Sequence, residues 1–252
     1  MTGAGLPILV VDLGDGVHAG FTMRDGGVSA PPWDALNLGL GTGDDPDHVQ
    51  ANREALERWI GAPVAFATQV HGAAVHIVDG SSVRGRPSVG EADALVSTSP
   101  DIAVAVLVAD CVPVLLADAS AGAVAAVHAG RRGLVAGVVE AAVDALVAAG
   151  ARASRIRAVI GPAIGGDQYE VPGRMRADVA GEVPEAWSTT RWGTPALDLP
   201  AGVAAVLRRV GVGRVEQVPT CTSRDPRFYS HRRSQAAGTT TGRCAGVVRL
   251  TG

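Results

Sequence analysis

Three side chains with metal-binding chemistry stand at the ends of predicted strands. His71 lies just after a predicted strand, in Thr68-Gln-Val-His-Gly72. Cys111 lies between two valine-rich runs, and His128 ends a third such run. Because strand ends meet at one rim of a sheet, we expect these side chains to converge. Two imidazoles and a thiolate are good zinc donors, and three protein ligands with an open fourth position are typical of catalytic zinc sites. The spacing therefore predicts one reactive centre.

Spacing alone leaves two other interpretations open. Cys111 beside a histidine could be a thiol nucleophile activated by a general base, and a cysteine among buried strands is often only a small apolar core residue. Asp110, directly before Cys111, and Asp93 could each orient a ligand or accept a proton, although an aspartate near a turn more often caps the backbone. The residues alone do not decide between a metal site, a thiol catalyst and an inert core.

Two arginine-rich segments are candidate anion sites. Gly130-Arg-Arg-Gly133 comes directly before a predicted helix, where free backbone N–H groups and guanidiniums suit phosphate. An ordinary solvated helix start explains the same residues equally well. Arg227-Phe-Tyr-Ser-His-Arg-Arg233 mixes aromatic and cationic side chains. These side chains could stack on a base and hold a charged group, or they could pack against the protein's own fold.

The apolar pattern predicts the elements that would position these residues. Asp45 and Pro46 predict a helix start and Gly61 its end, while a stripe of apolar residues at three- and four-residue steps predicts one continuous helix over 134–147. Further helices are expected at 174–183 and 199–210. Valine-rich runs of strand length lie at 64–70, 75–78, 102–108, 112–117, 123–127, 156–160, 215–218 and 245–250. The polar stretch 220–242 is expected to be a loop.

Composition and element order favour a single mixed-sheet domain. Hydrophobic residues make up 47% of the 252 residues and aromatic residues only 4%, so the core must be aliphatic. Helices are interspersed with strands, but several strands come in succession, which favours an α/β or α+β fold over a strict βαβ repeat. Three widely spaced cysteines without a CxxC pair argue against a zinc finger or a disulfide framework. A metal site must therefore be assembled from distant segments.

Charge and hydropathy exclude several kinds of partner. The net charge of −3 gives no basic surface for nucleic acid. No charged n-region precedes an apolar segment, and the longest apolar run, 102–108, is too short to cross a bilayer. We therefore expect a cytoplasmic monomer that binds a small molecule rather than nucleic acid or a membrane.

The motifs, taken together and in order, resemble those of the laccase-domain family, also called multicopper polyphenol oxidoreductase, purine nucleoside phosphorylase or peptidoglycan editing factor. They run nearly from end to end and include Gly20-Phe-Thr-Met-Arg-Asp-Gly-Gly-Val-Ser29, Leu36-Asn-Leu-Gly39, Asn52-Arg53, Gln69-Val-His-Gly72, Ala109-Asp-Cys-Val-Pro-Val114, Val127-His-Ala-Gly130, Gly161-Pro-Ala-Ile-Gly165 and Tyr169-Glu-Val171. One position departs from the family pattern: Arg131 stands where the family usually has tryptophan, whereas Arg132 matches the usual arginine.

The resemblance implies a fold and an activity. The fold is a mixed β-sandwich flanked by helices, a four-layer αββα domain spanning residues 1–252. Zinc, or alternatively copper, would be held by His71, Cys111 and His128. The activity would be phosphorolysis of adenosine, inosine and methylthioadenosine, with phosphate as co-substrate, together with deamination of adenosine. The resemblance also gives the remaining expected site residues, which are Asp110 for catalysis and Asn37, Arg53, Arg132, Phe228 and Arg232 for substrate and phosphate.

Three alternative functions remain. A thiol amidohydrolase, with Cys111 as nucleophile and His128 as base, would trim mis-built peptidoglycan precursors. A copper-dependent polyphenol oxidase is disfavoured, because three ligands fall short of the His-rich clusters that multicopper chemistry needs. A binding module would hold a metal or nucleoside without turnover.

Overall fold

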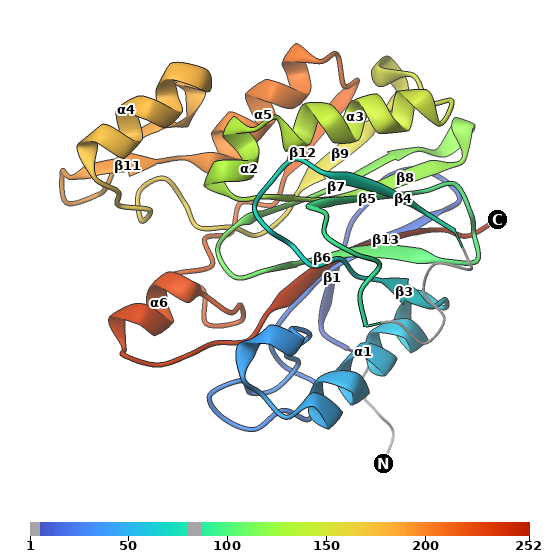
Figure 1. Ribbon diagram of the computed structural model, residues 1–252, viewed down its shortest axis with the longest axis horizontal. Coiled ribbons are helices and arrows are strands. Elements are labelled where there is room, and N and C mark those ends of the chain that lie inside the picture. The colour runs from blue at the N-terminus through green and yellow to red at the C-terminus, as the bar shows by residue number, and fades with distance from the viewer. Residues whose placement is uncertain (1–5, 80–86) are drawn as a thin grey trace.

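Most of the predicted strands pair into two sheets that stack face to face (Figure 1). The computed structural model describes residues 6–79 and 87–252. The five-stranded sheet has the order β1 (Ile8–Val10), β2 (Val17–Thr22), β13 (Cys244–Leu250), β6 (Ala103–Val108) and β3 (Val64–Ala65). The six-stranded sheet has the order β12 (Arg214–Gln217), β9 (Arg157–Ile160), β7 (Val112–Asp118), β8 (Ala123–Ala129), β5 (Ala94–Ser97) and β4 (Val75–Val78). A separate ribbon pairs β10 (Trp187–Thr189) with β11 (Pro195–Leu197).

Helices cover both outer faces of the stacked sheets, which confirms the predicted αββα order (Figure 1). The five-stranded sheet is covered by α1 (Pro46–Ile60), and the six-stranded sheet by α2 (Arg131–Val135), α3 (Val138–Ala148) and α5 (Leu199–Arg209). The remaining helices are α4 (Gly173–Glu182), which packs on the ribbon, and α6 (His231–Ala236). Short 3-10 turns lie at Leu40–Thr42, Ala119–Ala121, Ala153–Arg155 and Pro184–Ala186. No helix among the described residues is long and apolar enough to cross a membrane.

Three apolar layers hold the sandwich together. One lies between the sheets, one between the six-stranded sheet and its helices, and one between the five-stranded sheet and α1. Most of the side chains in these layers are alanine, valine or leucine, as composition predicts. The few aromatic rings need small neighbours: a Cβ atom at Gly161 would lie 2.3 Å from the Phe21 ring. Packing thus explains Gly161, the first residue of the Gly161-Pro-Ala-Ile-Gly165 motif.

Helix α1 begins and ends as predicted, but the helix expected over 134–147 is two helices. The Asp45 side chain accepts the N–H of Asp47, and Gly61, with φ 79°, ends α1. Between α2 and α3, Gly137 has φ 85°, a left-handed conformation that interrupts the helix although the apolar stripe continues. The apolar periodicity indicates which side chains are buried, but it does not reveal the break in the helix at Gly137.

Two further expectations are wrong in part. The strand expected over 64–70 stops at Ala65, because the following residues leave the sheet to carry His71. The stretch 220–242 is not all loop, since Ser230 caps the short helix α6 by accepting the N–H of Arg233. Sequence analysis also missed the short strands β1, β2 and β5, together with the ribbon.

Candidate metal centre

The chain passes from one sheet to the other at the rim where the predicted metal donors lie. Cys111 lies in the turn between β6 of the five-stranded sheet and β7 of the six-stranded sheet, and His71 lies in the segment that joins β3 to β4. His128 lies one residue before the end of β8. The donor atoms of these three side chains lie within 4.8 Å of one another. The structure therefore brings together three side chains able to hold one metal ion.

The backbone at His71 is held by a buried carboxylate. Its φ of 60° lies in the left-handed region that residues with a side chain rarely adopt. The N–H groups of Val70, His71 and Gly72 donate to the Asp93 carboxylate at 3.2, 3.0 and 2.7 Å. In addition, the Gln69 side-chain amide exchanges two hydrogen bonds with the backbone of β6, at 2.8 and 2.7 Å. These contacts fix the His71 segment against the sheet edge.

Asp93 also orients His128. The strand register places Ala94 of β5 opposite Val127 of β8, so Asp93 lies beside His128. The His128 Nδ1 donates to Asp93 Oδ1 at 2.8 Å, which leaves Nε2 available for a metal. Burial alone would raise the pKa of Asp93, but the bonds from His128 and from the backbone N–H groups of His71 and Gly72 lower it, so Asp93 is ionised. Strand pairing, which the sequence did not reveal, is the signal that identifies Asp93.

The electrostatics of the three side chains suit a metal ligand set. Burial acts to raise the pKa of Cys111, but His128 and His71 lower it to about 6. Burial acts to lower the pKa of His128, but the Cys111 thiolate and Asp93 raise it to about 9. At neutral pH the metal-free site is thus a thiolate beside an imidazolium, and a metal ion would displace the imidazolium proton. A thiolate and two imidazole nitrogens fit zinc.

Gly130 leaves the space that the donors need. A Cβ atom at this position would lie 2.7 Å from Cδ2 of His71 and 3.2 Å from Sγ of Cys111. Cys111 Sγ lies 3.8 Å from His71 Nε2, and the two imidazole rings meet edge to face with centroids 4.7 Å apart. Any side chain at position 130 would therefore displace the donors.

The donors lie between two cavities. One has a volume of about 420 Å³ and the other about 690 Å³. Both are lined by His71, Ala109, Cys111 and His231, and His128 lines only the larger one. The donors are therefore accessible from both cavities.

The expected phosphate-binding arginines are divided between these cavities. Arg132 and Arg232 line the smaller one, and Arg53 lines the larger. Arg53 is buried, and its guanidinium donates to the carbonyls of Leu38 and Pro87, both at 3.0 Å. Burial lowers the pKa of Arg53 to about 10, with Glu57 acting in the opposite direction. The three arginines therefore do not converge on one anion.

Asp110, which was expected to act in catalysis, is hydrogen-bonded to neighbouring segments of the chain. Its φ is 86°, and its Oδ1 and Oδ2 accept hydrogen bonds from Thr222 Oγ1 and from the N–H of Arg232, both at 2.6 Å. Ile164 donates its N–H to the Asp110 carbonyl at 3.0 Å. Asp110 therefore ties the Cys111 turn to two neighbouring segments, and each of its carboxylate oxygens accepts one hydrogen bond within the protein.

Asn37, which was expected to contact substrate, is buried in the structure. Asn37 is 0% exposed and lines neither cavity. Its side-chain N–H groups donate to Thr42 Oγ1 and Asp44 Oδ2 at 2.8 and 2.9 Å, and its Oδ1 accepts the N–H groups of Gly39 and Arg243 at 3.0 and 2.9 Å. Asn37 shapes the cavity wall by holding this loop.

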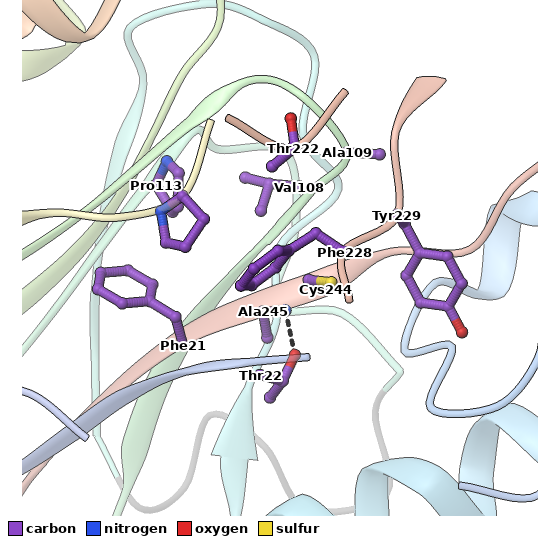
Figure 2. A pocket seen from close by; sticks show the side chains of 11 residues that line it. Phe21, Thr22, Val108, Ala109, Pro113, Thr222, Phe228, Tyr229, Cys244 and Ala245 are labelled. Atoms are coloured by element: carbon purple, nitrogen blue, oxygen red, sulfur yellow. Dashed lines mark hydrogen bonds between the residues drawn. The ribbon is translucent and has the colours of Figure 1, made fainter. Parts of the chain in front are cut away.

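Phe228 is likewise a core residue and not a platform for a base. Its side chain is 1% exposed and packs with Val108, Tyr229 and Cys244. Figure 2 shows its ring among these residues, around a void of about 10 Å³ that also touches Pro113. Such a void has room for about one water molecule and not for a purine. Sequence analysis had no means of predicting that this ring faces the core.

Comparison with known proteins places the chain in a family. The family model described as multi-copper polyphenol oxidoreductase laccase matches residues 18–251. A Streptomyces coelicolor protein named purine nucleoside phosphorylase is 52% identical over 95% of this chain and 98% of its own. Two crystal structures share the fold. Neisseria meningitidis protein NMB0706 is 35% identical with a TM-score of 0.87, and the match covers 98% of this chain and 100% of that one. Bacillus licheniformis YfiH is 32% identical with a TM-score of 0.88, and the match covers 98% of this chain and 97% of that one. The chain belongs to the multi-copper polyphenol oxidoreductase laccase family.

Proposed function

We propose that this protein is a zinc-dependent purine nucleoside phosphorylase that acts on adenosine, inosine and methylthioadenosine and also deaminates adenosine. The observation that carries the proposal is the group of His71, Cys111 and His128, whose donor atoms lie within 4.8 Å at the junction of two cavities. Relatives named purine nucleoside phosphorylase support the phosphorylase part of the proposal.

The chain's residues divide the work of phosphorolysis. Zinc on the three donors would supply Lewis-acid chemistry, and Asp93 holds His128 in the orientation that binds it. Arg132 and Arg232 attract phosphate to the smaller cavity, while the nucleoside lies in the larger one. An oxygen of phosphate then bonds to the anomeric carbon as the bond from that carbon to the purine nitrogen breaks. The proton that hydrogen phosphate gives up goes to the leaving base, and ribose 1-phosphate is formed.

The test is incubation of the purified protein, after elemental analysis, with each nucleoside in the presence and absence of phosphate. We expect zinc in the protein, free base only when phosphate is present, and inosine from adenosine under both conditions. The variant His71→Ala should lose zinc and both activities while its fold is retained. Copper in place of zinc, together with oxidation of phenols, would contradict the proposal.

A thiol amidohydrolase is the second candidate, because one observation favours it. The Cys111 thiol is hydrogen-bonded to His128, and its pKa is lowered. His128 in turn is oriented by the Asp93 carboxylate, as a general base for a thiol would be. Chelation separates the two candidates. A thiol hydrolase would keep its activity after chelation and lose it on alkylation of Cys111, whereas the phosphorylase should lose its activity on chelation and regain it with zinc.

A further inference from the structure

The smaller cavity carries an excess of positive charge beside the metal donors. Its wall includes Arg131 and Arg132 from α2 and Arg232 from α6. Within the described residues, none of these guanidiniums has a carboxylate within 4.0 Å. Eight other arginines do have such a partner, namely Arg24, Arg155, Arg157, Arg174, Arg209, Arg214, Arg224 and Arg227. Other arginines of the described chain, among them Arg53 and Arg243 in the wall of the larger cavity, also lack such a partner, but three unpaired arginines come together in the smaller cavity.

The carboxylate in the cavity wall, Asp110, offsets only one of these three positive charges. Asp110 is 8% exposed, and both of its oxygens already accept hydrogen bonds, from Thr222 and from the backbone N–H of Arg232. Those bonds also hold Arg232 in position, and its Nη2 donates to the carbonyl of Glu170 at 2.9 Å. The Arg232 guanidinium is therefore fixed before any ligand arrives, which reduces the entropy lost on binding.

Tyr169 adds a neutral donor to the same wall. The Arg232 guanidinium carbon lies 5.2 Å from the centroid of the Tyr169 ring. Burial and the nearby Cys111 thiolate raise the pKa of Tyr169 more than Arg131 and Arg232 lower it, so the phenol keeps its proton at neutral pH. A protonated phenol can donate to an anion without repelling it.

We propose that Arg131, Tyr169 and Arg232, together with Arg132, form a phosphoryl-binding subsite on one side of the metal donors. The subsite takes inorganic phosphate and the phosphate group of a ribose 1-phosphate, and the nucleoside lies in the larger cavity opposite. This inference rests on the proposed function and assigns its co-substrate to named residues. It adds Tyr169, which sequence analysis did not connect with phosphate, and it assigns Arg131 of the Gly130-Arg-Arg-Gly133 segment to the same ion.

The donor set favours a phosphoryl group over a carboxylate. Guanidiniums present several N–H groups in a planar fork, and with a phenol they can meet a tetrahedral ion on three or more of its oxygens. A carboxylate has only two oxygens in one plane.

The experiment measures phosphate and nucleoside separately in the zinc-loaded protein. Arg131→Gln and Tyr169→Phe should each raise the KM for phosphate by about tenfold, the effect of losing one charge-assisted hydrogen bond, and leave the KM for inosine unchanged. The matched control is Arg174→Gln on α4, whose side chain is 94% exposed. Calorimetric titration with phosphate alone should show the same order of affinities, and zinc content and circular dichroism should be unchanged in all variants.

The outcomes distinguish the subsite from the proposed function. An unchanged KM for phosphate in both variants would overturn the subsite and leave phosphorolysis in place. If no protein turns over a nucleoside, but the wild type binds phosphate about tenfold more tightly than the two variants, the subsite stands and the proposed function fails. Acetate that competes as well as phosphate would overturn the assignment to phosphoryl groups in favour of a carboxylate ligand.

Discussion

At the residue scale, one carboxylate supports two of the three metal donors. Asp93 accepts three backbone N–H groups around His71 and the Nδ1 proton of His128, and it is 0% exposed. Sequence analysis singled out the three donors as candidates because residue type and position at a strand end are local information, and the family resemblance assigned them to a metal. The surroundings of Asp93, Asn37 and Phe228 could not be predicted, because they depend on strand register and burial.

We predict that Asp93→Asn weakens zinc binding by about 10- to 100-fold, the range seen when an outer partner of a metal ligand is lost. An amide keeps the size of the side chain but turns an NH₂ group toward backbone donors. Competition with a chromophoric chelator measures the affinity, and the exposed Asp178→Asn is the control. Unchanged affinity in a folded variant would show that Asp93 does not position the ligands.

Gly130→Ala should also lower zinc affinity, because its methyl group would lie 2.7 Å from the His71 ring. Spectra of the cobalt-substituted protein would report the altered ligand geometry. Gly181→Ala in α4 is a matched control, since a Cβ atom there meets no atom within 4 Å. Identical cobalt spectra for wild type and Gly130→Ala would contradict the close approach.

At the element scale, the strands and capped helices were predictable, and the breaks between them were not. Asp45 and Gly61 mark the ends of α1 by side-chain and backbone chemistry that is visible in sequence. Gly137 interrupts the apolar stripe between α2 and α3 without changing its period. The segment after Ala65 is apolar enough for a strand, but the side chain of Gln69 takes the place of a strand partner for β6.

The end of β7 provides a prediction on pH. Asp118 is 1% exposed and accepts the N–H groups of Ala121 and Arg152 at 3.2 and 3.0 Å, with Arg155 Nε 3.3 Å away. Burial acts to raise the pKa of Asp118, but these partners lower it below its ordinary value of 3.8. Its stabilising effect is therefore complete above that value and is lost as pH falls through the lower, folded-state pKa.

Asp118→Asn should accordingly lower the free energy of unfolding by about 1–3 kcal/mol at pH 7. The difference from wild type should shrink as the pH falls below about 4. Urea unfolding at a series of pH values measures both quantities, with the exposed Asp15→Asn as the control. A difference that is constant down to pH 3 would mean that ionisation of Asp118 contributes nothing.

At the scale of the whole molecule, the metal donors lie where the chain crosses between the two sheets. Cys111 lies between β6 of one sheet and β7 of the other. His71 lies in another such crossing, between β3 and β4. A metal ion bound there would link segments that are distant in sequence. Zinc should therefore stabilise the entire sandwich and not only its rim.

Free zinc at about 1,000 times its Kd should add about 4 kcal/mol of stability, which for a chain of this length raises Tm by on the order of 10 °C. Differential scanning calorimetry of the metal-free and zinc-loaded forms measures the shift. His71→Ala should show no shift with zinc, and an equal shift in that variant would place the binding elsewhere.

The most direct test of the central claim is a titration of metal-free protein with zinc, followed by the rate of inosine phosphorolysis. If His71, Cys111 and His128 form the catalytic metal site, the rate should rise in proportion to added zinc and level off at one zinc ion per chain. Full turnover by the metal-free protein, or a rate that zinc does not change, would contradict the account.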